Sequence, residues 1–236
     1  MKNKWKVALH PIPEPEKYDT GLRYTDILFG FVIRELFLRL QNWANLDQAV
    51  RLHLVVGLTL VLGSWIGFRR SLNRPLYQLK FFNLPLIRFL LDQLMLILYF
   101  RIAVLTPAPE AGAVPISSPE PTSSLAQDTN RLVFYVFILY ALWDLLGILM
   151  ATTKYDNGKP RYPEVNPKDW TMTNKEQAIN RWGIGITAVC LLFFGIFCLL
   201  ADCLNPYQLF LATTVLLLVY RWSKEVRTSW KLPQPT

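Results

Sequence analysis

Residues 132–150, LVFYVFILYALWDLLGILM, form an apolar stretch in which Asp144 is the one charged residue. A helix needs about 20 mostly apolar residues to cross the ~30 Å hydrocarbon core of a bilayer. The stretch meets this requirement, and it predicts a transmembrane helix over residues 131–151.

Five further apolar runs lie on either side of this stretch. They cover residues 26–43, 52–68, 84–105, 183–203 and 206–221. Charged residues make up only 18% of the chain, whereas soluble domains carry about 25%. The sequence therefore predicts an all-α, polytopic integral membrane protein with six transmembrane helices. A chain with four or five spans is the alternative.

The net charge of +8 indicates how these spans are oriented. Lys and Arg accumulate on the cytoplasmic side of membrane helices. Most of the 25 basic residues fall in four segments, residues 1–24, 69–80, 152–182 and 221–231. Six crossings with both termini in the cytoplasm place all four segments on the same side. The basic residues are thus interpreted as a topology signal, and no nucleic-acid partner is expected.

This topology divides the chain into a cytoplasmic N-terminal segment, a membrane domain and a cytoplasmic tail, at residues 1–24, 25–222 and 223–236. Residues 106–130 are rich in Pro, Ser and Ala and contain no Lys or Arg, which predicts a flexible outer loop. Residues 152–182 form the largest inner loop. The loop contains a capping box, Thr173-Asn174-Lys175-Glu176, which predicts that a helix begins there, before the fifth span.

Ionisable residues within the spans are the candidates for a functional site, because each costs roughly 2.5–3.5 kcal/mol at the centre of a bilayer. Counting about 1.5 Å per residue from the inner end of each span places four of them in one layer, Arg34, Glu35, Asp92 and Asp144. Arg88 lies one helical turn before Asp92, so these two side chains can pair. The same spacing relates Glu35 to Arg39. The cluster either lines an ion or proton path, or it holds the helices together as structural ion pairs.

The other motifs in the chain indicate packing rather than chemistry. Gly63 and Gly67 form a small-xxx-small pattern, which favours close contact between helices. The three cysteines and two histidines lack the spacing of metal ligands, so neither a metal nor a cofactor is expected. The chain also contains no glycine-rich phosphate loop and no nucleophile elbow, which disfavours an enzyme.

The start of the first span carries a resemblance to a known family. Its residues are Arg23-Tyr24-Thr25-Asp26-Ile27-Leu28-Phe29-Gly30. This segment resembles the first helix of the six-helix potassium channels of bacteria and lysosomes that share a Phe-Ser-Asp motif, with Thr25 in place of the Ser. Trp65 in the second span resembles the Trp of that family's Trp-x-x-His motif, and Phe68 stands at the position of the His.

The resemblance implies a shared six-span fold, cytosolic termini and a first helix that lines a pore. Carried over by position, it implies that Gly30, Phe31 and Arg34 face the pore, where the charge of Arg34 would repel cations. It also implies that Asp26 bonds across to neighbouring helices. From the residues alone, Asp26 is a carboxylate near the positive end of the helix dipole and a candidate helix cap.

Three hypotheses about function follow. The first is an ion-conducting or pore-forming channel subunit in the plasma or inner membrane, which forms a homo-oligomer in the lipid bilayer and passes a monovalent ion. The second is a non-conducting membrane anchor or effector that binds a cytoplasmic protein through its basic inner loops. The third is a proton-coupled transporter that uses Asp92 or Asp144.

Overall fold

The structure, a computed structural model, describes residues 20–41, 43–71, 84–106, 122–152, 155–156, 159–160 and 174–229. Within these residues the chain forms six α-helices, α1 (Thr20–Leu40), α2 (Gln48–Ser71), α3 (Leu84–Val104), α4 (Thr122–Thr152), α5 (Asn174–Leu200) and α6 (Pro206–Ser229). A short 3-10 helix, η2 (Trp43–Asn45), precedes α2. Strand β1 (Tyr155–Asp156) pairs antiparallel with β2 (Lys159–Pro160). The predicted all-α class is confirmed, and these four strand residues are the exception within the described part of the chain.

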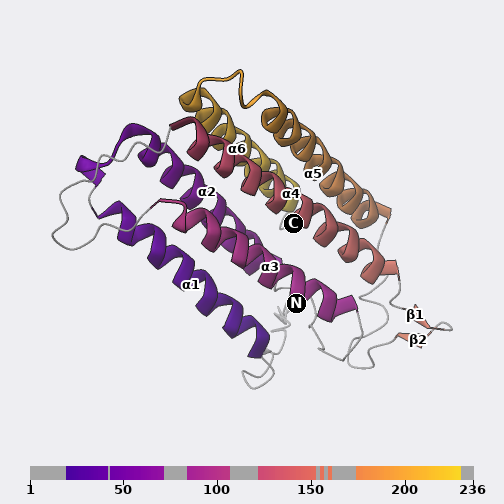
Figure 1. Cartoon of the computed structure of the whole chain (residues 1–236). Coiled ribbons are helices and arrows are strands. Elements are labelled where there is room, and N and C mark those ends of the chain that lie inside the picture. Colours follow the sequence, from indigo (N-terminus) through magenta and orange to yellow (C-terminus); the bar gives the residue numbers. More distant parts are fainter. Residues whose placement is uncertain are drawn as a thin grey trace, which may run out of the picture.

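The helices pack in two layers (Figure 1). Helices α1, α3, α4 and α5 lie side by side in this order, and α2 and α6 pack together against them. The described turns at residues 41–47 and 201–205 lie at one end of the bundle, which we call the turn end. The opposite end, where α2 leads to α3 and α4 leads to α5, is called the loop end.

Polar residues fix the points at which two of the helices begin. The Asp47 carboxylate accepts a hydrogen bond from the Ala49 amide at 2.9 Å, at the start of α2. The Asn205 side-chain oxygen accepts one from the Tyr207 amide at 3.0 Å, at the start of α6. These side chains satisfy amides that the first turn of a helix leaves unpaired. Pro206 occupies the first position of α6, where its missing N–H costs nothing.

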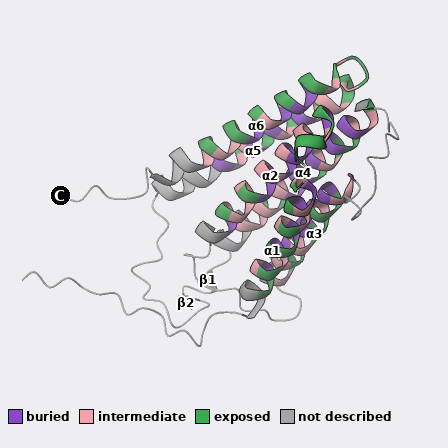
Figure 2. Ribbon diagram, turned by 90° about the vertical axis from the view of Figure 1, so that its left-hand side faces the viewer, coloured by how far each residue is buried: buried purple, intermediate pink, exposed green. Residues whose placement is uncertain are grey.

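Large apolar side chains are exposed on all six helices. Figure 2 shows where exposed residues lie along the ribbon. Phe31 on α1, Leu90 on α3 and Leu199 on α5 are more than half exposed. Charged side chains such as Arg88 and Asp92 are buried instead. A soluble protein rarely exposes such continuous apolar surface and rarely buries charge, so this distribution is typical of a bundle surrounded by lipid.

Among the described residues, three helices are long and apolar enough to cross a membrane, at Gln48–Phe68, Ser123–Gly147 and Gly183–Leu200. They belong to α2, α4 and α5, and they indicate a membrane protein, as the sequence predicted. Ser123–Gly147 includes most of the stretch around Asp144 from which the prediction started.

Several helices extend beyond the predicted spans, α4 and α6 among them. Helix α4 begins at Thr122, so residues 122–130 are helical although they were predicted to belong to the outer loop. This polar segment can enter the core because the buried side chains of Thr129 and Asn130 find partners on other helices. Helix α6 continues to Ser229, past the predicted end of its span at residue 221. Residues 107–121 and Thr173 of the predicted capping box lie outside the described residues, although α5 begins at Asn174 as that motif suggests.

Candidate functional site

Asp144 joins three helices at the loop end of the bundle. Its Oδ2 atom accepts a hydrogen bond from Lys224 Nζ on α6 at 2.7 Å and another from Thr187 Oγ1 on α5, also at 2.7 Å. The Asp144 and Lys224 side chains are 15% and 17% exposed, so this ion pair is largely shielded. Lys224 Nζ also lies 5.3 Å from the centre of the Tyr220 ring, within the range of a cation–π contact. The ion pair and its hydroxyl neighbour thus connect α4, α5 and α6.

The sequence analysis placed Lys224 in the segment 223–236 and left it out of the charged cluster. Helix α6 continues past its apolar run. This extension brings Lys224 to the carboxylate of Asp144, 80 residues earlier in the chain. A long lysine side chain can follow an apolar surface and still place its ammonium group next to a buried acid. No local pattern in the sequence marks this partner.

Arg88 and Asp92 form a second buried charged group, on α3. The Arg88 guanidinium carbon lies 3.6 Å from the centre of the Trp143 ring on α4. Asp92 follows one turn later and interacts electrostatically with Arg88, as the i, i+4 spacing predicted. Gly147 lies beside the guanidinium, and a Cβ atom there would make only an ordinary contact, 3.9 Å from Arg88 Nη1. Arg88 therefore joins α3 to α4 through the aromatic face of Trp143, while its charge faces Asp92 on its own helix.

Arg221 of α6 occupies the space beside Gly63 and Gly67 of α2. A Cβ atom at Gly67 would lie 2.6 Å from Arg221 Nη1, and one at Gly63 would lie 3.8 Å from Arg221 Cδ. The sequence interpreted the two glycines as a motif for close helix contact. In the structure Gly67 makes room for the guanidinium group of a long charged side chain, whereas a Cβ atom at Gly63 would make only an ordinary contact with it.

Three hydroxyl groups meet beyond these charges, nearer the middle of the bundle. Tyr99 Oη on α3 lies 2.9 Å from Ser64 Oγ on α2 and 2.8 Å from Tyr140 Oη on α4. Ser64 and Tyr140 also form a hydrogen bond. Ser64 further donates to the Leu60 carbonyl at 2.6 Å. The sequence analysis missed this cluster, because each residue comes from a different helix and no spacing connects them.

Arg39 and Glu35 of α1 belong to a separate polar region at the turn end. Arg39 is buried, and its Nε atom donates to the Thr106 carbonyl at 2.7 Å, just past the end of α3. Its Nη1 atom donates to Glu35 Oε2 at 2.8 Å. The predicted pairing of Glu35 with Arg39 is confirmed. The sequence analysis related Arg39 to Glu35 alone, whereas in the structure Arg39 also links α1 to the end of α3.

His53 has a comparable position on α2. Its Nε2 atom lies 3.0 Å from the Ile102 carbonyl in the last turn of α3, and since a carbonyl can only accept, Nε2 carries the hydrogen. Its Nδ1 atom lies 2.7 Å from Thr129 Oγ1 on α4. His53 is fully buried, so these two contacts replace its interactions with water. The sequence analysis saw an isolated histidine because both partners are distant in the chain.

The residues predicted to face a pore lie on the outside of this single-chain bundle. Gly30 has no other atom within 4 Å of a Cβ placed on it, and Phe31 is 55% exposed. The Arg34 side chain is 64% exposed and lies 3.3 Å from Glu35. The expectation that Arg34 is buried with Asp92 and Asp144 is therefore wrong for one chain. The reason is helical phase, because Arg34 lies opposite the buried Val32 and Leu36.

Asp26 differs from these three residues because it faces the second layer. Its Oδ1 atom accepts a hydrogen bond from Trp65 Nε1 on α2 at 3.2 Å. The contact joins the two segments that carry the channel resemblance. One turn later, Phe29 packs 5.9 Å from Phe68, the residue that stands in the position of the family's His.

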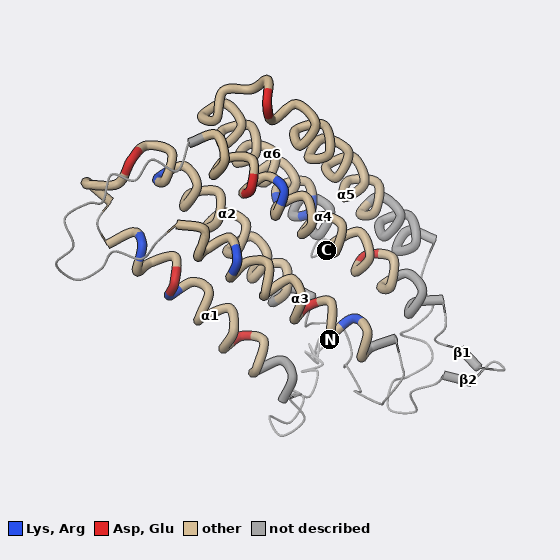
Figure 3. The backbone as a smooth tube through the Cα atoms, in the orientation of Figure 1, with Lys and Arg blue, Asp and Glu red and all other residues tan. Residues whose placement is uncertain are grey.

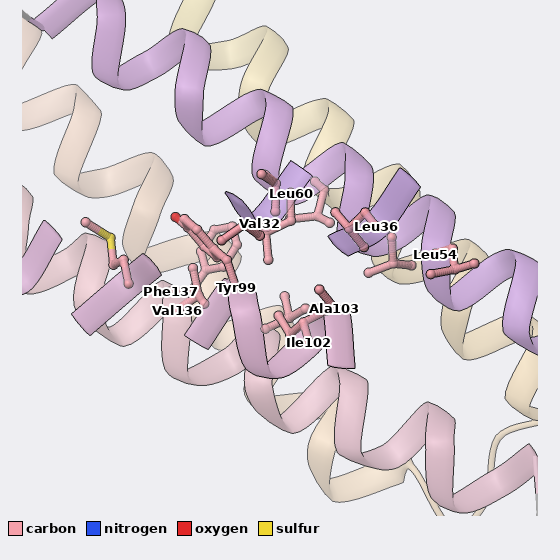
Figure 4. Packing of buried hydrophobic residues seen from close by; sticks show 14 of the residues in the cluster. Val32, Leu36, Leu54, Leu60, Tyr99, Ile102, Ala103, Val136 and Phe137 are labelled. Carbon is pink, nitrogen blue, oxygen red and sulfur yellow. The ribbon is translucent and has the colours of Figure 1, made fainter. Parts of the chain in front are cut away.

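An apolar layer separates the two polar regions (Figure 4). On α2 it includes Val56, Leu60 and Val61, which lie between His53 and Ser64. On α4 it includes buried side chains between Thr129 and Tyr140, among them Val136 and Phe137. Phe137 lies 4.5 Å from Phe194 of α5 and 4.8 Å from Tyr220 of α6, measured between ring centres. The side chains of this layer thus pack against one another across the bundle.

The sequence-predicted site therefore divides into three groups. Glu35 pairs with Arg39 at the turn end, Asp92 and Asp144 belong to the charged groups at the loop end, and Arg34 faces outward. Among the described residues, no group of three or more His, Cys, Asp or Glu side chains is placed to hold a metal ion.

Comparisons of the chain with protein-family models, with curated proteins and with solved structures found no match.

Proposed function

We propose that the protein crosses the plasma or inner membrane six times, with both termini in the cytoplasm. The apolar outward faces of all six helices support six spans. Helix α3 illustrates the point, because Arg88 and Asp92 are buried inside while Ile87, Leu90 and Leu94 face outward. A helix with charged residues can lie in lipid when its charges face protein partners.

We further propose that copies of the chain assemble into an ion-conducting homo-oligomer, with α1 beside the path. The apolar layer inside the bundle argues against a path through one chain, which leaves the contact between copies. The observation that carries the proposal is Arg34, whose charged side chain is 64% exposed on a face shared with Ile27 and Phe31. Lipid is an unfavourable surrounding for that charge, and a water-filled path between copies relieves the cost.

Glu35 leaves this positive charge in place. Its carboxylate lies 2.8 Å from Arg39 and 3.3 Å from Arg34, so two guanidinium groups share one acid. The outward face of α1 therefore carries a net positive charge in its middle section.

Reconstitution tests the proposal. The purified protein is placed in liposomes, and ion flux is measured for potassium, sodium, chloride and protons. The oligomer mass is determined in the detergent used for purification. We expect flux of at least one monovalent ion and a mass above that of a monomer. A monodisperse, folded protein that passes none of these ions contradicts the proposal.

The second candidate is a non-conducting anchor that binds a cytoplasmic protein. The paired interior charges favour it, because Asp144–Lys224 holds α4 and α6 together in the manner of a structural ion pair. This candidate predicts that the unmodified protein conducts no ions and that Asp144→Ala lowers the amount of folded protein. A proton-coupled transporter is a third candidate, supported by the hydroxyl contact of Asp144 with Thr187. It predicts saturable, pH-dependent uptake.

A further inference from the structure

Three neighbouring helices each carry one arginine on the outward face. The arginine row consists of Arg34 on α1, Arg101 on α3 and Arg131 on α4. The Arg34 and Arg131 side chains are 64% and 62% exposed, and Arg101 is exposed as well. Each arginine continues a stripe of exposed residues at helical spacing, Ile27 and Phe31 on α1, Leu94 and Ile97 on α3, Tyr135 and Leu142 on α4.

The first two arginines lie at the same height in the bundle. Helices α1 and α3 both run toward the turn end, and Arg39 Nε touches the Thr106 carbonyl at 2.7 Å. Arg34 lies five residues before Arg39, and Arg101 lies five residues before Thr106. Both therefore lie about 7.5 Å on the loop-end side of this contact, at 1.5 Å per helical residue.

The contacts of His53 show that the third arginine, Arg131, lies at a similar height. It contacts the Ile102 carbonyl on α3 at 3.0 Å and Thr129 on α4 at 2.7 Å. Arg101 directly precedes Ile102, and Arg131 follows Thr129 by two residues on a helix that runs the other way. The three arginines thus form one row across α1, α3 and α4, nearer the turn end than the loop end (Figure 3).

Positive charge prevails along this row. Glu35 is shared between Arg34 and the closer Arg39, as described above. Within the described residues, Arg131 forms an ion pair with Asp128, at a distance of 3.7 Å among exposed side chains. Such an exposed pair is weakly held and is screened by salt. Within the described residues, Arg101 forms no ion pair.

We propose that the arginine row makes the path selective for anions. This inference rests on the proposed function, because it assigns a substrate class to the same path. Arginine side chains lining a pore attract anions and repel cations.

The test measures the ratio of chloride to potassium permeability. The full chain is reconstituted in planar bilayers under a potassium chloride gradient, and the reversal potential is recorded. We expect the unmodified protein to prefer chloride. In the triple variant Arg34→Gln, Arg101→Gln and Arg131→Gln we expect the ratio to fall at least tenfold, because the positive charges that attract the anion and repel the cation are lost.

Two controls accompany this variant. The triple Arg→Lys variant keeps the charge and retains the preference for chloride. Lys231→Gln removes one positive charge from the C-terminal segment, outside the described residues, and leaves the ratio unchanged. The three arginines are exposed, and size-exclusion chromatography checks that each variant is folded.

The outcomes separate the inference from the proposed function. If neither the unmodified protein nor any variant conducts ions, the proposed function is wrong and the inference fails with it. If the protein conducts but the triple Gln variant keeps its permeability ratio, the inference alone is wrong. In that case binding of lipid phosphate by the row is the remaining explanation, and anionic lipid then stabilises the unmodified protein more than the triple Gln variant.

Discussion

The two polar regions inside the bundle solve the problem of buried charge in different ways. At the loop end, Asp144 and Lys224 meet as a pair of opposite charges from different helices, 2.7 Å apart. At the turn end, Arg39 and His53 place their N–H groups on the carbonyls of Thr106 and Ile102. The loop end is therefore joined by an ion pair between helices, whereas at the turn end the ion pair of Glu35 with Arg39 lies within α1 and the links to α3 are made to backbone carbonyls.

The difference follows from where α3 ends. The last carbonyls of a helix have no partner within it, and the C-terminal end of the helix carries partial negative charge. The N–H groups of a histidine and an arginine can donate to these carbonyls, and the positive charge of the arginine is attracted to the negative end of the helix. At the loop end the acids and bases lie on the sides of helices, so they satisfy one another. Removing a group should thus leave an unpaired charge at the loop end and an unpaired carbonyl at the turn end.

The largest expected effect is that of Asp144→Leu, which leaves Lys224 without its carboxylate. Removing one partner of a buried ion pair destabilises a protein by about 3–5 kcal/mol. We expect a loss of this order in the free energy of unfolding, measured by denaturant titration in mixed micelles. The double variant Asp144→Leu and Lys224→Met should recover most of it, because no buried charge is then unpaired.

The exposed pair of Arg131 and Asp128 is the matched control. Its atoms are 3.7 Å apart and both side chains are more than half exposed, so Asp128→Leu should cost less than about 1 kcal/mol. Equal losses for Asp144→Leu and Asp128→Leu would show that burial of the loop-end pair does not matter.

A smaller effect is expected for His53→Leu at the turn end. The substitution keeps an apolar side chain in the site but leaves the Ile102 carbonyl and the Thr129 hydroxyl without this partner. An unsatisfied buried polar group costs about 1–3 kcal/mol. The same unfolding titration measures the loss, and Thr129→Val, which affects one of the two contacts, should lose less. A loss larger than that of Asp144→Leu would reverse the order that we derive for the two ends.

The smallest effect distinguishes the two glycines of α2. Gly67→Ala places a methyl group 2.6 Å from the Arg221 guanidinium, whereas Gly63→Ala meets Arg221 at an ordinary 3.8 Å. We expect Gly67→Ala to cost about 1 kcal/mol because the side chain must move, and Gly63→Ala to be neutral or slightly stabilising through helix propensity. Thermal midpoints in detergent compare the two. Similar losses at both positions would restore the interpretation of the pair as a close-contact motif.

Parts of the site that depend on neighbours along one helix could be predicted from the sequence. The pairing of Glu35 with Arg39 is an example, since residues four apart share a helix face. The pairing of Asp144 with Lys224 could not be predicted, because the partners are 80 residues apart on helices whose contact no local pattern specifies. The same holds for the Tyr99–Ser64–Tyr140 hydroxyls and for His53.

The sequence by itself determined that the chain is helical, where its helices lie to within several residues, and that it is suited to a membrane. An apolar run of bilayer length forms a helix in lipid, because a helix satisfies the backbone N–H and C=O groups of the run internally. Only the tertiary structure decided which charges are inside. Arg34 and Arg39 are five residues apart on one helix, yet the first faces outward and the second is buried. The physical reason is that helical phase becomes burial only when neighbouring helices define which side is the interior.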